Sequence, residues 1–147
     1  MQIRQILLAE NDPNDIELTL AALDEYDLAK NTIVARDGVE ALDYLYQRDQ
    51  FAKRSPGNPA VVLLDLKMPR VNGIEVLRQV KKDPKLHNVP IVVLTSSRES
   101  QDIVQSYDLG VNAYVVKPVI FTEFIEVVKR LGLFWVLTNE PIPDVAG

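Results

Sequence analysis

Residues 61–69 read Val-Val-Leu-Leu-Asp-Leu-Lys-Met-Pro, and this stretch decides the fold. Four apolar residues end in one carboxylate, Asp65, and the turn residues Pro69 and Gly73 follow it. A short apolar run bounded by turn signals indicates a strand that is buried on both faces of a parallel sheet. Open α/β sheets bind their ligands at the carboxyl ends of their strands, which is where Asp65 lies. Because an unpartnered buried charge is costly, we expect a metal ion, a lysine or phosphoryl chemistry beside it.

Four further apolar runs have the length of strands and alternate with amphipathic stretches. The five predicted strands cover residues 6–9, 32–35, 61–64, 91–94 and 113–116. Apolar residues recur at helical spacing between and after them, at Ile16, Leu20 and Leu23, at Val39, Leu42, Leu45 and Tyr46, at Ile74, Leu77 and Val80, and at Phe121, Phe124, Ile125 and Val128. This alternation predicts βαβ units, and therefore an α/β protein with a parallel sheet and helices on both of its faces.

The predicted fourth helix, over residues 100–109, has a sparse apolar stripe. A helix with few buried contacts opens at a low free-energy cost. That property suits a surface that switches, and a marginal peripheral helix explains the same pattern equally well.

The composition excludes several classes of protein. A chain of 147 residues forms one domain with a real core and is too short for two ordinary ones. The net charge is −5 and the basic residues are spread along the chain, which argues against a nucleic-acid surface. There is no cysteine for a disulfide or a metal site, no apolar run long enough to span a membrane, and no signal-peptide pattern. We therefore expect a soluble, cytoplasmic protein that binds neither nucleic acid nor membrane.

Polar residues follow four of the five predicted strands. They are Glu10, Asn11 and Asp12 after the first strand, Asp65 after the third, Thr95, Ser96 and Ser97 after the fourth, and Lys117 and Pro118 after the fifth. Each alone is explained by a helix cap, a turn hydroxyl or a solvated lysine. The carboxyl ends of parallel strands converge on one crevice, however, so we expect these groups to form one site. Carboxylates, a hydroxyl and an ammonium together suit a divalent cation and an oxyanion.

On these residues the chain resembles the receiver domain of two-component response regulators, over nearly its whole length. The matching motifs are Glu10, the 65–69 turn with Gly73, Thr95, and the pair Lys117-Pro118. The resemblance implies a flavodoxin-like, doubly wound sheet of five strands in the order 2-1-3-4-5. It also implies a signalling protein that is not an enzyme. A phosphatase with an aspartyl nucleophile is the weaker alternative, because such enzymes need a second carboxylate where Lys67 stands.

The same resemblance implies a role for each group at the sheet edge. Asp65 is expected to take a phosphoryl group from a sensor histidine kinase, and Thr95 and Lys117 to bind the phosphoryl oxygens. The Lys117–Pro118 bond is expected to be cis, as in the family. Mg²⁺ is expected as the cofactor, held by Glu10, Asn11, Asp65 and the backbone carbonyl of Lys67.

Three further positions are expected to control the switch and its rate. Tyr114 matches the family's switch aromatic, which moves together with Thr95, although a tyrosine that packs against a strand edge explains it equally well. Lys67 and Ser97 stand two residues after Asp65 and Thr95, where the family tunes the lifetime of the phosphoryl group. Solvated rim groups are the alternative for both.

Asn11 is the departure from the family pattern, because two acidic residues usually follow the first strand. An asparagine oxygen still binds Mg²⁺, but one negative charge is lost, so we expect weaker metal binding. Asp12 is predicted to be a helix cap, since Asp12-Pro13 with Asp15 has the pattern of a cap, a first-turn proline and a first-turn acid, and metal ligation by Asp12 is the alternative. The alternative function is therefore a pseudo-receiver, a scaffold of the same fold that takes no phosphate.

The last part of the chain predicts a partner contact. We place the receiver domain at residues 1–131 and a C-terminal extension at 132–147, which carries Leu133, Phe134, Trp135 and Leu137. Such an apolar segment indicates either an arm that reaches a second copy and makes a homodimer, or a longer last helix that covers its own core. A long second helix, the 53–59 loop and this tail resemble the single-domain regulators paired with phytochrome-type histidine kinases.

Overall fold

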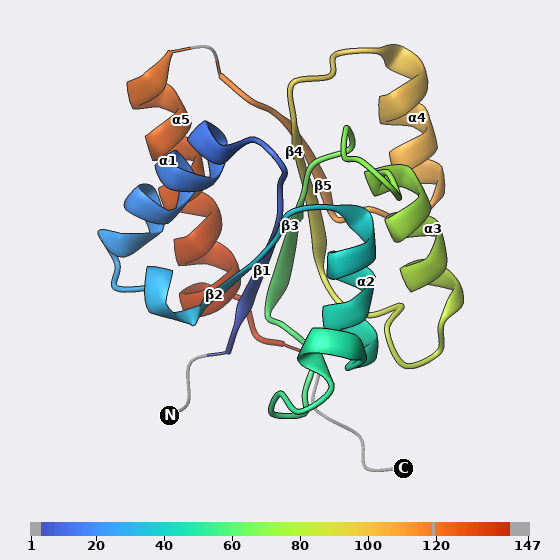
Figure 1. Cartoon of the computed structure of the whole chain (residues 1–147). Helices are drawn as coiled ribbons and strands as arrows, with labels where there is room; N and C mark the ends of the chain where they lie inside the picture. Colours follow the sequence, from blue (N-terminus) through green and yellow to red (C-terminus); the bar gives the residue numbers. More distant parts are fainter. Residues whose placement is uncertain (1–3, 119, 142–147) are drawn as a thin grey trace.

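The computed structural model describes residues 4–118 and 120–141 as one five-stranded parallel sheet flanked by helices (Figure 1). The strands are β1 (Ile6–Ala9), β2 (Thr32–Ala35), β3 (Val61–Leu64), β4 (Ile91–Thr95) and β5 (Ala113–Val116). The helices are α1 (Pro13–Asp24), α2 (Gly38–Tyr46), α3 (Gly73–Lys82), α4 (Ser100–Asp108) and α5 (Phe121–Gly132). Three short helical segments are η1 (Ala29–Asn31), η2 (Asp49–Phe51) and η3 (Leu133–Thr138). The strand order β2-β1-β3-β4-β5 confirms the predicted topology, and β4 extends one residue beyond its predicted end.

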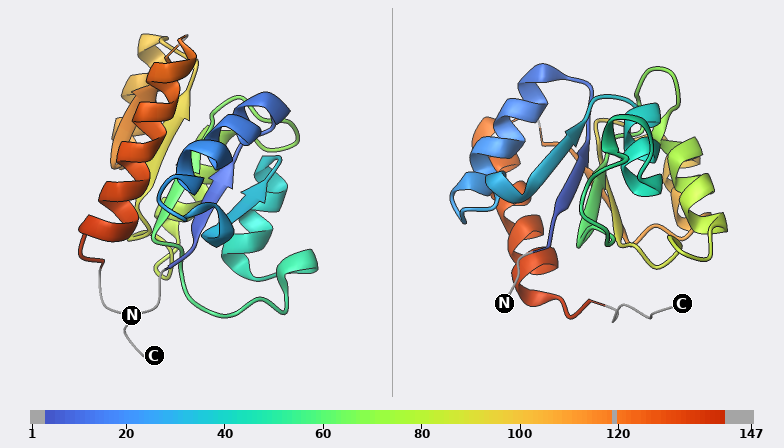
Figure 2. Two further views of the ribbon diagram at one scale, coloured as in Figure 1. Left: turned by 90° about the vertical axis from the view of Figure 1, so that its left-hand side faces the viewer. Right: turned by 60° about the horizontal axis from the view of Figure 1, so that its bottom comes forward.

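Helices α1 and α5 cover one face of the sheet, and α2, α3 and α4 cover the other (Figures 1 and 2). Successive residues of each strand point to opposite faces. In β1, Ile6 and Leu8 join the core beneath α1 and α5, while Leu7 and Ala9 join the core on the opposite side. The continuous apolar runs of the sequence are explained in this way, because both faces of the central strands are buried.

Polar side chains start the first three α-helices. The carboxylate of Asp12 accepts hydrogen bonds from the backbone N–H groups of Asn14 (2.8 Å) and Asp15 (3.2 Å), with Pro13 at the first helical position. Asp37 caps α2 and Asn72 caps α3 in the same manner. The prediction that Asp12 is a helix cap is confirmed, and the beginning of α1 is thereby set beside the end of β1.

The turn after β3 depends on a glycine and an ion pair. The N–H of Gly73 donates to the carbonyl of Leu66 (2.9 Å), and a Cβ at Gly73 would lie 2.3 Å from the carbonyl oxygen of Asp65. Arg70 adopts a left-handed backbone conformation (φ 64°) and pairs with the α2 cap, Asp37, at 2.7 Å. The loop that carries Asp65 and Lys67 is therefore joined to both α2 and α3.

The second helix is shorter than expected. It ends at Tyr46 because Gln47 takes a left-handed conformation (φ 54°), and the separate turn η2 follows. The aromatic ring of Tyr44 packs edge-on against Phe51 of η2, with ring centroids 5.2 Å apart, and the guanidinium of Arg54 lies 4.0 Å from the Tyr44 ring centre. These contacts connect the 53–59 loop to α2.

The C-terminal segment continues α5 as the π-helical stretch η3. Trp135 and Val136 are half-buried and pack against the core beneath α1 and α5. The exposed large apolar side chains of η3 are Leu133, Phe134 and Leu137. The longer-helix interpretation is thus confirmed for Trp135, while the other three residues stay open to a partner; residues 142–147 of the predicted extension lie outside the described part. In the described ranges, every helix is too short or too polar to cross a membrane.

Candidate functional site

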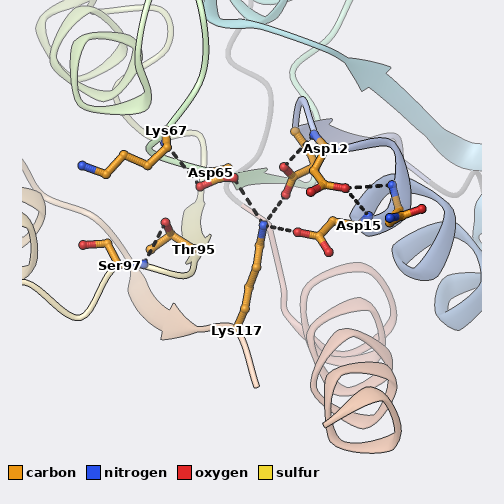
Figure 3. A network of polar contacts seen from close by, with 9 residues as sticks. Asp12, Asp15, Asp65, Lys67, Thr95, Ser97 and Lys117 are labelled. Atoms are coloured by element: carbon orange, nitrogen blue, oxygen red, sulfur yellow. Dashed lines mark hydrogen bonds and ion pairs between the residues drawn. The ribbon is translucent and has the colours of Figure 1, made fainter. Parts of the chain in front are cut away.

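The predicted site residues lie at the carboxyl edge of the sheet (Figure 3). Ladder hydrogen bonds extend past the strand ends and set the backbone there. The N–H of Glu10 donates to the Ala35 carbonyl (2.9 Å) and that of Lys117 to the Thr95 carbonyl (2.7 Å). Asp65 continues the ladder from β3 to β1, its N–H donating to Ala9 at 3.0 Å. Adjacent parallel strands therefore deliver their side chains to one place.

The ammonium of Lys117 is the centre of the site. Its Nζ lies 2.5 Å from Glu10 Oε1, 2.7 Å from Asp15 Oδ2 and 3.3 Å from Asp65 Oδ2. The side chains of Lys117, Glu10 and Asp65 are 7%, 4% and 9% exposed, and that of Asp15 is 26% exposed. A lysine has three N–H donors, and each of them faces a different carboxylate here.

Burial and charge shift the protonation of this cluster. Burial raises the pKa of Glu10 to about 7, against the hydrogen bond from Lys117 and with the help of the nearby Asp65 charge. Burial acts to lower the pKa of Lys117, but its hydrogen bonds to Asp15 and Glu10 and the charge of Asp65 outweigh burial, so the pKa lies above its ordinary value. Lys117 is therefore a permanent cation beside the candidate phosphoacceptor.

A magnesium ion at this site would need neutral oxygen ligands in addition to the carboxylates. Across residues 4–118 and 120–141, no three acidic, histidine or cysteine side chains are grouped so that they could hold a metal ion. Glu10 and Asp65 are two buried carboxylates at one place. Asn11 and Lys67 both line a cleft of about 610 Å³, and these two residues carry an amide oxygen and a backbone carbonyl. Hard oxygen donors of these kinds are what Mg²⁺ takes in proteins, usually with several waters retained.

A second polar network lies on the β4 side of Asp65. Thr95 is fully buried, and its Oγ1 accepts a hydrogen bond from the N–H of Ser97 (3.3 Å). The hydroxyl of Ser97 donates to Asp102 of α4 (2.6 Å), and the hydroxyl of Tyr114 donates to the Ser97 carbonyl (3.0 Å). Lys67 approaches the same Asp102 at 3.7 Å, although its side chain is 67% exposed. The predicted switch and rate-tuning residues are therefore in one connected group; their roles stay predictions.

The expected cis bond before Pro118 is wrong. All peptide bonds within the described residues are trans, including Lys117–Pro118. The trans isomer is favoured even before proline, by about 0.5–1 kcal/mol. Lys117 reaches its three carboxylates with the trans bond in place.

Two acidic residues of the site were not predicted from the sequence. Asp15 was interpreted only as a first-turn acid of α1, which the helix dipole favours by itself, yet its carboxylate bonds to Lys117. Asp102 lies in the first turn of α4, where the same local preference accounts for it, yet it joins Ser97 to Lys67. The position of each at a helix start facing the sheet edge was the available signal.

The sequence and the fold define the class of this protein. The response regulator receiver domain family matches residues 6–129, and the chain belongs to that family. Receiver domains of this kind are signalling modules of two-component systems.

One relative, and its solved structure, match nearly the whole chain. Response regulator Rcp1 of Synechocystis sp. is 35% identical over 133 residues, which cover 90% of this chain and 89% of that protein. The structure of the Mn²⁺-bound form of Rcp1 superposes with a TM-score of 0.87, at 34% identity, covering 95% of this chain and 99% of that one.

Two other solved structures are phytochrome response regulators. Phosphorylated RcpA, a cyanobacterial phytochrome response regulator, has a TM-score of 0.88 at 37% identity, covering 95% of this chain and 99% of that chain. The bacteriophytochrome response regulator AtBRR is 56% identical with a TM-score of 0.75, covering 95% of this chain and 100% of its own. The chain is thus similar to regulators named for phytochromes.

Proposed function

We propose that this chain accepts a phosphoryl group from a sensor histidine kinase on Asp65, with Mg²⁺ bound, and passes the signal on through protein contacts. The observation that carries the proposal is the buried carboxylate of Asp65 at the end of β3, with the Lys117 ammonium 3.3 Å away. An anionic nucleophile beside a fixed cation suits phosphoryl transfer, which proceeds mainly by positioning and charge stabilisation.

The chemistry uses groups that the chain supplies. A carboxylate oxygen of Asp65 attacks the phosphorus of a phosphohistidine, and an acyl phosphate forms. The P–N bond breaks, and its electron pair returns to the imidazole nitrogen. The ammonium of Lys117 and the hydroxyl of Thr95 bind phosphoryl oxygens. Bound at Glu10, Asn11, Asp65 and the Lys67 carbonyl, Mg²⁺ would neutralise phosphoryl charge.

Two partners are part of the proposal, and the relatives and the exposed apolar side chains of η3 support them. The relatives named as phytochrome response regulators support a phytochrome-type histidine kinase as the phosphodonor. The exposed apolar side chains of Leu133, Phe134 and Leu137 support a homodimer formed through η3. Trp135 would support this surface from behind, since its ring packs edge-on against Phe134 with centroids 5.0 Å apart.

Phosphorylation is tested with a small phosphodonor and Mg²⁺, with intact mass as the readout. The wild-type chain is expected to gain one phosphoryl adduct, and Asp65→Asn to gain none because the nucleophile is removed. Asp24→Asn is the matched control, since Asp24 is exposed at the end of α1, and it is expected to keep the adduct. If the wild-type chain forms no adduct at any Mg²⁺ concentration, it is a pseudo-receiver scaffold instead.

A further inference from the structure

A third carboxylate, Asp15, contacts Lys117 from the first turn of α1. At 2.7 Å this contact is shorter than the 3.3 Å contact between Lys117 and Asp65. We propose that Asp15 is a positioning residue, which holds the ammonium of Lys117 at the site when a cation and a phosphoryl group occupy Glu10 and Asp65. This role rests on the proposed function, because it concerns the same site.

The three contacts of Lys117 are not equivalent once the site is loaded. Glu10 and Asp65 are the carboxylates that a divalent cation and the phosphoryl group require, so their bonds to Lys117 compete with loading. Asp15 is the partner that remains, because no role in binding the cation or the phosphoryl group falls on it. Because Lys117 keeps its bond to Asp15, its bonds to Glu10 and Asp65 break more readily.

The location of Asp15 suits this role. Its backbone N–H is tied to the Asp12 cap at 3.2 Å, which sets the first turn of α1 beside the pocket. Its side chain is 26% exposed, so it lies at the rim, outside the buried pair of Glu10 and Asp65. Figure 3 shows the carboxylates of Asp15 and Asp65 on opposite sides of the Lys117 ammonium.

The geometry favours an action through Lys117 over direct metal binding. In the part of the chain that the structure describes, Glu10, Asp15 and Asp65 are not grouped as a three-carboxylate metal site. Asp15 therefore contacts the site through the ammonium of Lys117.

The first experiment measures Mn²⁺ affinity, from the electron paramagnetic resonance signal of the free ion. Asp15→Asn is expected to weaken binding by about three- to tenfold, because Lys117 then stays bonded to Glu10 and Asp65, the carboxylates that the cation needs. Asp15→Glu is expected to recover most of the affinity. Glu17→Gln removes one charge from an exposed position on the same helix and is the matched control, with no more than about a twofold effect.

The second experiment repeats Asp15→Asn in a Lys117→Gln background. If Asp15 acts by holding the lysine, its loss there is expected to change Mn²⁺ affinity by less than about twofold. An equal effect in both backgrounds would show that Asp15 acts as a ligand or as a distant charge, and would overturn the proposal. No effect of Asp15→Asn in the wild-type background would overturn it as well. Circular dichroism of each variant checks that the fold is retained.

Failure of this inference is distinguishable from failure of the proposed function. If Asp65 is phosphorylated but Asp15→Asn leaves Mn²⁺ affinity unchanged, the role of Asp15 alone is wrong. If Mn²⁺ affinity depends on Asp15 through Lys117 but no phosphoryl adduct forms, the phosphoacceptor function is wrong and the role of Asp15 at the cation site stands. A wild-type chain that binds no Mn²⁺ contradicts both.

Discussion

Glu10 is a buried carboxylate whose pKa is raised in the folded protein. Its side chain is 4% exposed and close to Asp65, and burial raises its pKa to about 7. In the folded protein Glu10 therefore holds a proton over a pH range in which the unfolded chain, with the ordinary pKa of 4.5, has released it. Below that pH range Glu10 is protonated in both the folded and the unfolded protein, and above it Glu10 is ionised in both.

Stability is therefore expected to fall as the pH rises from about 5 to about 7.5, since the folded state binds more protons there. The free energy of unfolding without metal is expected to drop by about 1–2 kcal/mol more in the wild type than in Glu10→Gln, which cannot titrate. Urea unfolding in a chelator at both pH values measures this. Equal slopes for the two proteins would show that burial of Glu10 does not govern its protonation.

At the scale of the elements, α4 depends on polar contacts. Its one buried residue is Ser106, and two of its large apolar side chains, Val104 and Tyr107, are 58% and 53% exposed. Asp102 connects the start of α4 to Ser97 and Lys67, which stand next to the predicted switch and phosphoacceptor residues. The sparse apolar stripe was visible in the sequence, and the contact through Asp102 was not.

Asp102→Ala is expected to loosen α4 without unfolding the sheet. The loss of the Ser97 hydrogen bond and of a first-turn acid should lower the local opening free energy by about 1 kcal/mol, which corresponds to roughly fivefold faster amide exchange in α4. Hydrogen exchange read by mass spectrometry measures it. Asp108→Ala, at the exposed end of the same helix, is the control and should not accelerate exchange; identical protection in Asp102→Ala and wild type would contradict the anchoring role.

At the scale of the whole molecule, η3 has both packed and exposed apolar side chains. Trp135 and Val136 pack against the core of their own domain, so η3 is part of the fold. Leu133, Phe134 and Leu137 are 39%, 48% and 49% exposed on the other side of the same segment. The proposed dimer therefore needs a face of η3, and it does not need the segment to leave its own domain.

The double variant Phe134→Ser, Leu137→Ser is expected to shift the solution mass from dimer to monomer, because it removes apolar area from the proposed contact. Light scattering after size-exclusion chromatography measures the mass. The double variant Val104→Ser, Tyr107→Ser removes exposed apolar side chains from α4 instead and should leave the mass unchanged. A dimer that survives the change in η3, or a wild-type monomer, would contradict this surface.

The sequence by itself determined the strands, their order by family resemblance, and the set of Asp65, Thr95 and Lys117 at one edge of the sheet. The strands and the residues at their ends follow from local information, because apolar runs, caps and turn residues are neighbours along the chain. Only the tertiary structure decided that Lys117 bonds to Asp15, which lies 102 residues away, and that Asp102 joins Ser97 to Lys67. It also decided the trans bond before Pro118 and the packing of Trp135. A first-turn acid looks the same in the sequence whether it faces water or a buried ammonium, and only the packing of α1 and α4 against the sheet distinguishes the two.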